Sequence, residues 1–311
     1  MSEYDVVVIG GGAAGLSAAL VLSRARRSVA VVDAGEPRNA PAAHMHGFLS
    51  RDGMPPGELL AVGRAEVAGY GTQLISGTVT GISPRAMTGY VVLRADGPPL
   101  IARRVVVATG LRDEMPDIPA LRERWGRDLL HCPYCHGYEV RDQPLGVLGG
   151  TPNAVDHALV VRQWSADVVF FPHTDVLVDD EAERLAARGI DVVEGAVTKL
   201  AVVNDRLYGV ELDDGRLVRR TAVFVRPRLV PTSDLLIRLG CATDGSGLVV
   251  TDVTGRTSVP GVWVAGNVTN PRAQVITAAG EGSSAAIAVN ADLVDEDVAV
   301  AVRAARTRAS A

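Results

Sequence analysis

Gly10-Gly11-Gly12-Ala13-Ala14-Gly15 is the stretch that decides the fold of the amino-terminal part of this chain. It follows Tyr4–Ile9, a short and continuous run rich in Val and Ile, which predicts a buried strand. It opens Ala13–Arg26, where the apolar residues recur at helical spacing. Ser28–Val32 predicts a second buried strand, so the chain begins with a strand–helix–strand unit typical of a parallel sheet covered by helices.

The glycines of this run fit the pattern G-x-G-x-x-G, which suits the approach of a dinucleotide. Gly10 permits a tight turn, Gly12 lets the backbone approach a pyrophosphate, and Gly15 lets the helix pack closely on the strand. The amino terminus of the helix then faces the anion. Asp33 ends the second strand about 20 residues later, where an acid is expected to hold a ribose hydroxyl. The pattern therefore predicts a dinucleotide site.

A second unit of the same kind begins in the middle of the 311-residue chain. Leu145–Leu148 predicts a strand, Gly149-Gly150 a turn, Ala154–Ser165 a helix and Asp167–Phe171 the next strand. We therefore predict an α/β fold of two Rossmann-like, three-layer ββα domains, the second inserted into the first. The expected domains are 1–112 with 241–311, and the insert 113–240. Residues 40–57, rich in Pro, Gly and His, are expected to form a long loop, and the last helix is expected at Thr277–Val294.

Composition limits the classes of function. Charged residues make up 22% and the net charge is −5, so no basic surface for nucleic acid is indicated. Val6–Leu22 is apolar, but the acidic residues before it and the glycines within it argue against a signal peptide. No other stretch reaches the length of a membrane span. We expect a cytoplasmic protein that acts on neither nucleic acid nor membrane.

His131-Cys132-Pro133-Tyr134-Cys135-His136 carries the predicted chemistry. The C-x-x-C spacing lets two sulfurs form a small-ring disulfide, in which one thiolate can have a lowered pKa and the other can resolve a mixed disulfide. His136 directly follows the pair and is a candidate acid or base near neutral pH.

Other interpretations of this run remain open. C-x-x-C-H is also the attachment pattern of c-type haem, which requires export. A zinc site would need two further ligands, and His44 and His46 lie far away in the sequence, so no metal is expected. The cysteines could also be inert. Cys241 stands alone in an apolar stretch and is interpreted as a core residue.

Taken together, these features resemble the low-molecular-weight thioredoxin reductases over essentially the whole chain. The matching segments are Gly10–Gly15, Ala108-Thr109-Gly110, Cys132–Cys135, Thr257–Val262, Ala265-Gly266-Asn267, and Gln274 with the helix after it. The resemblance implies FAD as cofactor, bound by the first and last segments, and a homodimer formed through those segments.

The resemblance also implies a role for individual residues. Residues 33–39 are expected to line the adenosine, Val79 to lie near the adenine, and Gly266 and Asn267 to hold the ribityl chain. Gln274 and Val275 are expected to reach the isoalloxazine ring, and His44 or His46 to line the flavin or the substrate cleft. The expected FAD-binding residues are Gly10, Gly12, Ala13, Ala14, Gly15, Asp33, Ala34, Arg38, Asn39, His46, Val79, Ala108, Thr109, Gly110, Gly266, Asn267, Gln274 and Val275.

The insert departs from the family where NADPH would bind. Thr151 stands where close approach to the pyrophosphate requires Gly, and Pro152 removes a backbone N–H from the helix start. The next strand is followed by residues 172–176, which carry Asp175 and no Arg to grip a 2′-phosphate. The family's Gly-containing turn near the nicotinamide is replaced by residues 225–228. Productive NADPH binding is therefore not expected.

A C-P-Y-C-H-G-Y-E run beside a degraded nucleotide site resembles the thioredoxin-reductase-like dithiol oxidases of the holomycin and gliotoxin type. The hypothesis is oxidation of a small-molecule dithiol, with Cys132 attacked by substrate, Cys135 passing electrons to FAD, and His136 moving protons. O2 would accept the electrons as H2O2. The alternatives are a disulfide reductase supplied by NAD(P)H or ferredoxin, and a flavin-binding sensor without catalysis.

Overall fold

The computed structural model describes residues 2–85 and 89–310, and the chain divides into two compact units. Unit 1 contains residues 1–38, 57–112 and 231–311, and unit 2 contains residues 39–56 and 113–230. The division differs from the expected boundaries at two places: residues 231–240 lie with unit 1, and residues 39–56 lie with unit 2. The units are described separately below.

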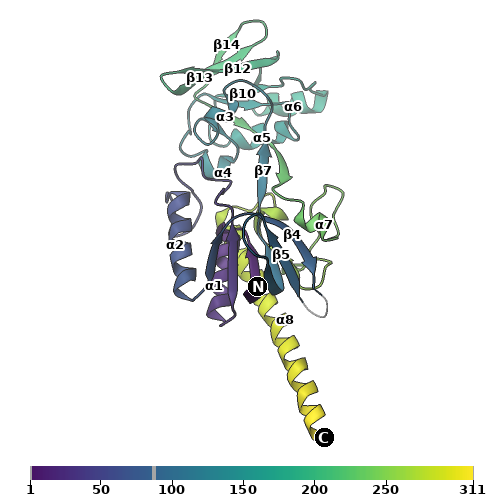
Figure 1. Ribbon diagram of the computed structural model, residues 1–311. Coiled ribbons are helices and arrows are strands. Elements are labelled where there is room, and N and C mark those ends of the chain that lie inside the picture. The colour runs from purple at the N-terminus through teal and green to yellow at the C-terminus, as the bar shows by residue number, and fades with distance from the viewer. Residues whose placement is uncertain (1, 86–88, 311) are drawn as a thin grey trace. The chain divides into compact units, whose positions relative to one another are not determined.

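Unit 1 is built on a mixed sheet whose strands all lie in the described residues (Figure 1). The order β3-β2-β1-β6-β5-β4 is extended by β17, which pairs with β6. The pairs from β3 to β6, and β17 with β6, are parallel, whereas β5 is antiparallel to both its neighbours. The strands are β1 (Ser2–Ile9), β2 (Val29–Asp33), β3 (Gln73–Ser76), β4 (Val79–Pro84), β5 (Tyr90–Arg94), β6 (Leu100–Val107) and β17 (Val262–Val264).

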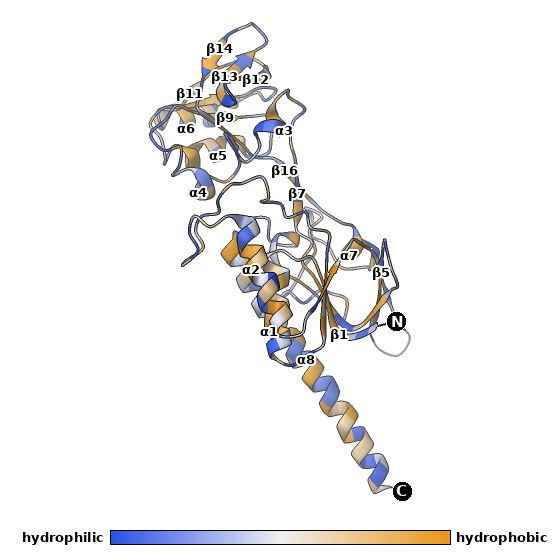
Figure 2. Cartoon of the chain, turned by 60° about the vertical axis from the view of Figure 1, so that its left-hand side comes forward, coloured by the Kyte–Doolittle hydropathy of each residue, from blue (hydrophilic) through white to orange (hydrophobic). Residues whose placement is uncertain are grey.

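Both faces of this sheet are buried, which explains the unbroken apolar sequence of β1. Val6 and Val8 pack on one side with α1 (Ala13–Arg24) and α8 (Val275–Ala309), and Val7 and Ile9 pack on the other. Figure 2 shows orange, apolar residues alternating with blue, hydrophilic ones along the two helices. The helices touch closely, because a β-carbon on Gly282 would lie 2.0 Å from the carbonyl oxygen of Ala14. The remaining helices of unit 1 are α2 (Pro56–Gly69), α7 (Leu235–Arg238) and the 3-10 turn η1 (Gly266–Val268).

Helix α8 runs further than the sequence pattern indicated, to Ala309 rather than Val294. Its acidic segment is held to unit 1 by arginines: Arg27 and Arg103 bind Asp297, and Arg104 binds Asp292. No Gly or Pro interrupts the alanine- and arginine-rich residues 298–309, so the helix continues beyond these ion pairs with every side chain exposed.

Unit 2 contains a parallel sheet of order β11-β10-β9-β15-β8. Its strands are β8 (Leu129–Leu130), β9 (Leu145–Leu148), β10 (Val168–Phe171), β11 (Asp191–Val192) and β15 (Ala222–Val225), and its helices are α3 (Leu121–Arg124), α4 (Pro133–His136), α5 (Ala154–Val161) and α6 (Asp179–Ala187). An antiparallel sheet not expected from the sequence is formed by β12 (Val197–Val203), β13 (Arg206–Leu212) and β14 (Leu217–Arg219). The paired strands β7 (Leu111–Glu114) and β16 (Arg228–Pro231) contain the boundaries of the unit.

Residues 39–56, which nearly coincide with the long loop expected at 40–57, have an ordered path within unit 2. The backbone of Met45 pairs with Met54 and Gly53, and the Met45 side chain is buried. Pro41 packs against Gly126, where an added β-carbon would lie 3.0 Å from it. This packing is the physical reason that the segment leaves unit 1.

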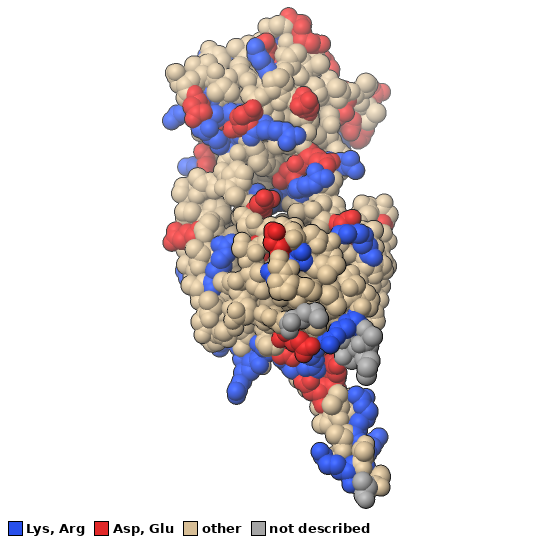
Figure 3. Space-filling model, in the orientation of Figure 1, with Lys and Arg blue, Asp and Glu red and all other residues tan. Residues whose placement is uncertain are grey.

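The predicted fold class is confirmed: both units carry Rossmann-type parallel sheets with helices packed on them. In the described residues, no helix is long and apolar enough to cross a membrane. On the face shown in Figure 3, basic and acidic side chains are interspersed, and no continuous basic area is visible.

Candidate active site

The first glycine turn in unit 1 has the geometry of a phosphate cradle. Gly10 has φ +106°, and a β-carbon there would lie 2.4 Å from the carbonyl oxygen of Ala108. A β-carbon on Gly15 would lie 1.9 Å from the carbonyl oxygen of Gly10, so helix α1 depends on that glycine for its contact with the turn. By contrast, a β-carbon on Gly12 would meet nothing within 4 Å. The turn is thus closed on the protein side and open where a pyrophosphate would lie.

Asp33 lies beside this turn, at the end of β2. Its carboxylate accepts a hydrogen bond of 3.0 Å from the backbone N–H of Gly11 and pairs with Arg64 at 3.1 Å. It also lines a cavity of about 310 Å³ with Gly35 and Ser76. The aspartate therefore braces the turn, and its second oxygen faces an arginine that the sequence reasoning did not single out.

Thr109 supplies independent support for a ligand at this edge of the sheet. It follows the carboxyl end of β6, and its backbone nitrogen would lie 3.2 Å from a β-carbon on Gly10. Its Oγ1 is buried, and no hydrogen-bond partner for it is found among the described residues. A buried hydroxyl normally has a partner, so a ligand hydroxyl or phosphate is a fitting one.

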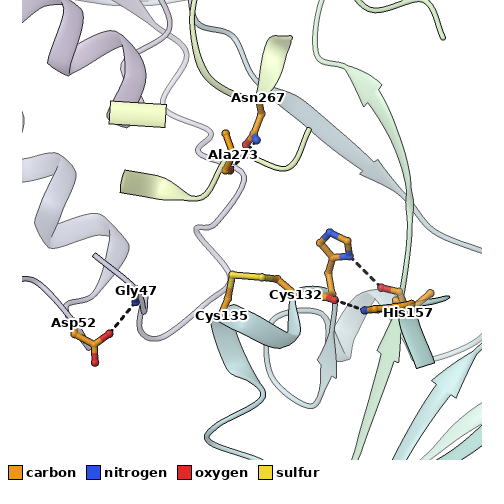
Figure 4. The surroundings of a disulfide bond; sticks show 9 residues. Gly47, Asp52, Cys132, Cys135, His157, Asn267 and Ala273 are labelled. Atoms are coloured by element: carbon orange, nitrogen blue, oxygen red, sulfur yellow. Dashed lines mark hydrogen bonds between the residues drawn. A yellow bond between two sulfur atoms is a disulfide. The ribbon is translucent and has the colours of Figure 1, made fainter. Parts of the chain in front are cut away.

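The carboxy-terminal segment that was predicted to bind FAD is organised by Glu281, on α8. Its carboxylate accepts hydrogen bonds from the backbone N–H of Gly266 (2.8 Å) and the side-chain amide of Asn270 (2.6 Å). Asn267 donates its side-chain amide to the carbonyls of Asn270 and Ala273 at 2.9 and 3.0 Å (Figure 4). An Asp at 267 could not donate these bonds. Asn267 thus braces the loop and keeps Oδ1 as an acceptor for a hydroxyl.

The other predicted cofactor residues fall in both units. Ala13, Ala14, Ala34, Arg38, Val79 and Gly110 lie in unit 1, as do Gln274, the N-cap of α8, and Val275, its first residue. Ala14 lies next to Gly266, where an added β-carbon would lie 3.0 Å from the alanine methyl. Asn39 and His46 lie in unit 2. Among the described residues, no group of three or more His, Cys, Asp or Glu side chains could hold a metal ion.

Cys132 and Cys135 form a disulfide at the start of α4 in unit 2 (Figure 4). Cys132 is the N-cap, Pro133 occupies the first turn, and the N–H groups of Cys135 and His136 both donate to the Cys132 carbonyl at 3.1 Å. Proline is preorganised for this position. Both cysteines are half-buried, so the disulfide stays accessible at the surface of unit 2.

His136 ends α4 and is half-buried. Burial lowers the pKa of its imidazole, the Glu139 carboxylate opposes this effect, and the charge of His46 adds to it. His46 comes from the ordered segment 39–56, and its Nε2 lies 3.5 Å from Oε1 of Glu139. A neutral imidazole at neutral pH is the form that can accept a thiol proton.

His157, on α5, supports the backbone in front of the cysteines. Its Nε2–H donates to the carbonyl of His131 at 2.8 Å, and its Nδ1 is buried with no partner found in the described part of the chain. Burial, together with the charges of His131 and Arg226, lowers the pKa of His157 to about 4. The ring is thus a neutral structural donor, which the sequence reasoning missed.

The second glycine turn, after β9, differs from the first because the chain fills it. The N–H of Gly150 donates to the Asp175 carboxylate at 2.7 Å. His173 and Thr174 pack against Gly150, where an added β-carbon would meet them at 3.0 and 3.2 Å. Asn153, with φ +58°, stands at the start of α5. A resident carboxylate therefore holds a backbone donor that would otherwise face a phosphate.

The chain is similar to known proteins in sequence and in fold. A family model described as pyridine nucleotide-disulphide oxidoreductase matches residues 4–282. The thioredoxin reductase sirT of Leptosphaeria maculans is 32% identical, covering 96% of this chain and 97% of that protein. The crystal structure of HlmI is 60% identical with a TM-score of 0.96, covering 99% of this chain and 97% of that one. A putative thioredoxin reductase from Bacillus anthracis is 34% identical with a TM-score of 0.90, covering 94% and 99%.

These similarities confirm the predicted resemblance to thioredoxin-reductase-like flavoproteins and FAD as the cofactor. The residues of unit 1 fit that cofactor, because the first glycine turn is open and Thr109 lacks a partner among the described residues. The individual FAD contacts stay predictions. Glu281 and Arg64 were not predicted, although a glutamate between two glycines on a helix is an unusual pattern that could have marked the first of them.

Proposed function

We propose that this chain, which belongs to the pyridine nucleotide-disulphide oxidoreductase family, closes a disulfide in a small-molecule dithiol and delivers the electrons to O2. The chain is a thioredoxin-reductase-like, FAD-dependent thiol/disulfide oxidoreductase. The observation that carries the proposal is the contrast between the two glycine turns. The first is open at Gly12, whereas the second is occupied by the carboxylate of Asp175. A dianionic 2′-phosphate or a pyrophosphate near Asp175 would meet repulsion instead of donors.

The proposed reaction begins at the Cys132–Cys135 disulfide. A substrate thiolate attacks Cys132, which breaks the protein disulfide and forms a mixed disulfide, leaving Cys135 as a thiolate. The second substrate thiolate then attacks the substrate sulfur of the mixed disulfide and releases the product. His136 accepts the thiol proton in each deprotonation. The substrate loses two electrons and two protons, and the cysteine pair is reduced.

When bound, FAD would supply the acceptor for the two electrons of the reduced pair, and O2 would receive them to become H2O2 with two protons. In this proposal the turn of Gly10, Gly12 and Gly15 holds the pyrophosphate and Asp33 the adenosine end, while the loop at Gly266 and Asn267 holds the ribityl chain. A homodimer and a cytoplasmic location are parts of the same proposal.

A second candidate is a disulfide reductase that runs in the opposite direction. It is favoured by the similarity to sirT, which is named a thioredoxin reductase. Electrons would then enter from NAD(P)H or a donor such as ferredoxin and leave through the cysteines. Asp175 on Gly150 argues against the nicotinamide donor.

The deciding experiment uses the flavin-loaded protein. Excess dithiothreitol added anaerobically should bleach the flavin, and readmission of air should restore its colour with one H2O2 per disulfide formed. Cys135→Ser should abolish both effects. NADPH alone should not bleach the wild type. Rapid bleaching by NADPH, with no oxygen uptake on dithiol, would establish the reductase instead.

A further inference from the structure

The segment 39–56 brings a second histidine and one carboxylate, His46 and Asp52, to Glu139, which follows the proposed proton acceptor His136 in the chain. His46 lies between Asp52 and Glu139: its Nδ1 is 3.4 Å from the Asp52 carboxylate and its Nε2 is 3.5 Å from the Glu139 carboxylate. All of these residues and His136 belong to unit 2. A protonated His46 can therefore donate toward one carboxylate from each ring nitrogen.

Asp52 is itself held in place. Its Oδ1 accepts the backbone N–H of Gly47 at 2.9 Å (Figure 4), and this bond, with the one from His46, lowers the pKa of the Asp52 carboxyl. The segment is closed by backbone bonds between Met45, Gly53 and Met54, and His44 binds the Gly53 carbonyl at 2.9 Å. An anchored carboxylate fixes the orientation of the ring that it pairs with.

Glu139 follows His136 by three residues. Gly137 keeps right-handed helical dihedrals after α4, and positions three residues apart share one face of a helical turn. The charges that act on His136 are Glu139, on its own segment, and His46, on the segment packed against it; the first favours the imidazolium and the second opposes it. The exposed fraction of the side chain is 22% for His46 and 44% for Glu139, so neither charge is fully screened by water.

We propose that the carboxylate of Glu139, which lies against His46 on its Asp52 anchor, stabilises the proton that His136 accepts from a substrate thiol. The inference rests on the role proposed above for His136. In this arrangement the thiol S–H bond breaks, His136 keeps the proton as an imidazolium, and the Glu139 carboxylate compensates its charge. His46 acts on the pKa of His136 in the opposite direction to Glu139, so that His136 can still return the proton.

The test compares Glu139→Gln with His46→Gln in the flavin-loaded protein. Both changes keep a hydrogen-bonding side chain; the first removes the carboxylate charge, and the second removes a ring that can bind a proton. The readout is the titration midpoint of His136, followed by NMR of histidine-labelled protein in the oxidised state. Glu139→Gln should lower the midpoint, and His46→Gln should raise it. Glu183→Gln, which removes an exposed carboxylate on α6, is the matched control and should leave it unchanged. Flavin absorbance and melting temperature check that each variant is folded.

Opposite displacements are an outcome that a merely structural role would not produce. Displacements in the same direction, or none beyond the control, would overturn the assignment. For turnover of dithiothreitol, Glu139→Gln should lower kcat/KM about tenfold, part of the 100-fold or more that general acid–base catalysis contributes, and should displace the acid limb of the pH profile to lower pH. If the wild type failed to oxidise dithiols, the proposed function would fall, while the NMR titration would still decide the coupling of these side chains.

Discussion

The backbone N–H of Gly150 donates a hydrogen bond of 2.7 Å to the carboxylate of Asp175, in the turn where a dinucleotide-binding sheet would present that N–H to a phosphate. The chain thus carries its own anion at the second of its two glycine turns. Asp175 follows β10 by a short turn of the same chain, so its carboxylate is present at high effective concentration and competes with any incoming phosphate.

Asp175→Ala should therefore raise the affinity for NADPH above that of the wild type, because it removes both the bond and the repulsive charge. Binding is measured by fluorescence titration of the flavin-loaded protein. Asp191→Ala, an exposed aspartate on β11 of the same unit, is the control and should have no effect. If the wild type already bound NADPH tightly, the resident carboxylate would not be a barrier.

Gly12 and Gly15 should respond differently to substitution. Gly12→Val should fold but lose FAD, since its side chain would enter the open space of the turn. Gly15→Ala should prevent folding or strongly destabilise the protein, since its β-carbon would overlap the carbonyl of Gly10 at 1.9 Å. The measurements are the flavin-to-protein ratio and the melting temperature. A Gly12→Val protein that kept its flavin would remove the cofactor from this turn.

Glu281→Ala should weaken FAD binding, and this effect does not require that Glu281 contacts the cofactor. It leaves the Gly266 N–H and the Asn270 amide without their acceptor, a loss of about 1–3 kcal/mol for a buried group. The loop of Gly266 should loosen, and the rate of FAD release should rise about tenfold. The rate of FAD release from Glu281→Gln, which keeps one acceptor oxygen, should fall between the rates of the wild type and of the alanine variant. Unchanged release in the alanine variant would contradict the bracing role.

His157 should make the stability of unit 2 depend on pH. Its pKa is lowered to about 4 in the folded chain, against about 6.5 when unfolded. Between these values the unfolded chain binds a proton at this side chain and the folded chain does not. The contribution of His157 to the free energy of unfolding is therefore complete above pH 6.5. It is lost as the pH falls toward 4, by up to about 1.4 kcal/mol per pH unit.

His157→Gln should reduce this dependence, while the side-chain amide can still donate to the His131 carbonyl. The measurement is the difference in melting temperature between pH 7.5 and pH 5. His44→Gln, a change at an exposed histidine, should retain the full difference. Equal pH dependence in all three proteins would show that His157 does not titrate in this way.

The parts of the fold that were predictable are those with a strong local signal. β1, the turn at Gly10–Gly15 and β2 follow from continuous apolar runs and from glycines that the backbone geometry needs. The disulfide follows from the spacing of Cys132 and Cys135. In each case a few neighbouring residues determine the structure.

The parts that were missed depend on residues far apart in the sequence. Segment 39–56 was expected to be a loop because its Pro, Gly and His content disfavours regular elements, yet it packs on Gly126 and its His46 approaches Glu139. The end of α8 was misplaced because its acidic segment breaks the apolar pattern, and the arginines that neutralise those acids lie some 190 to 270 positions earlier. No local pattern reports such pairings.

The path of segment 39–56 also determines how the protein can be divided. Neither unit is a single continuous piece of chain, since the polypeptide passes between them four times. A gene fragment encoding 113–230 would retain the cysteines but would leave Gly126 without Pro41 and Glu139 without His46. Its disulfide would then react in an environment different from that of the intact enzyme. A reduction potential measured on that fragment would therefore describe the fragment alone.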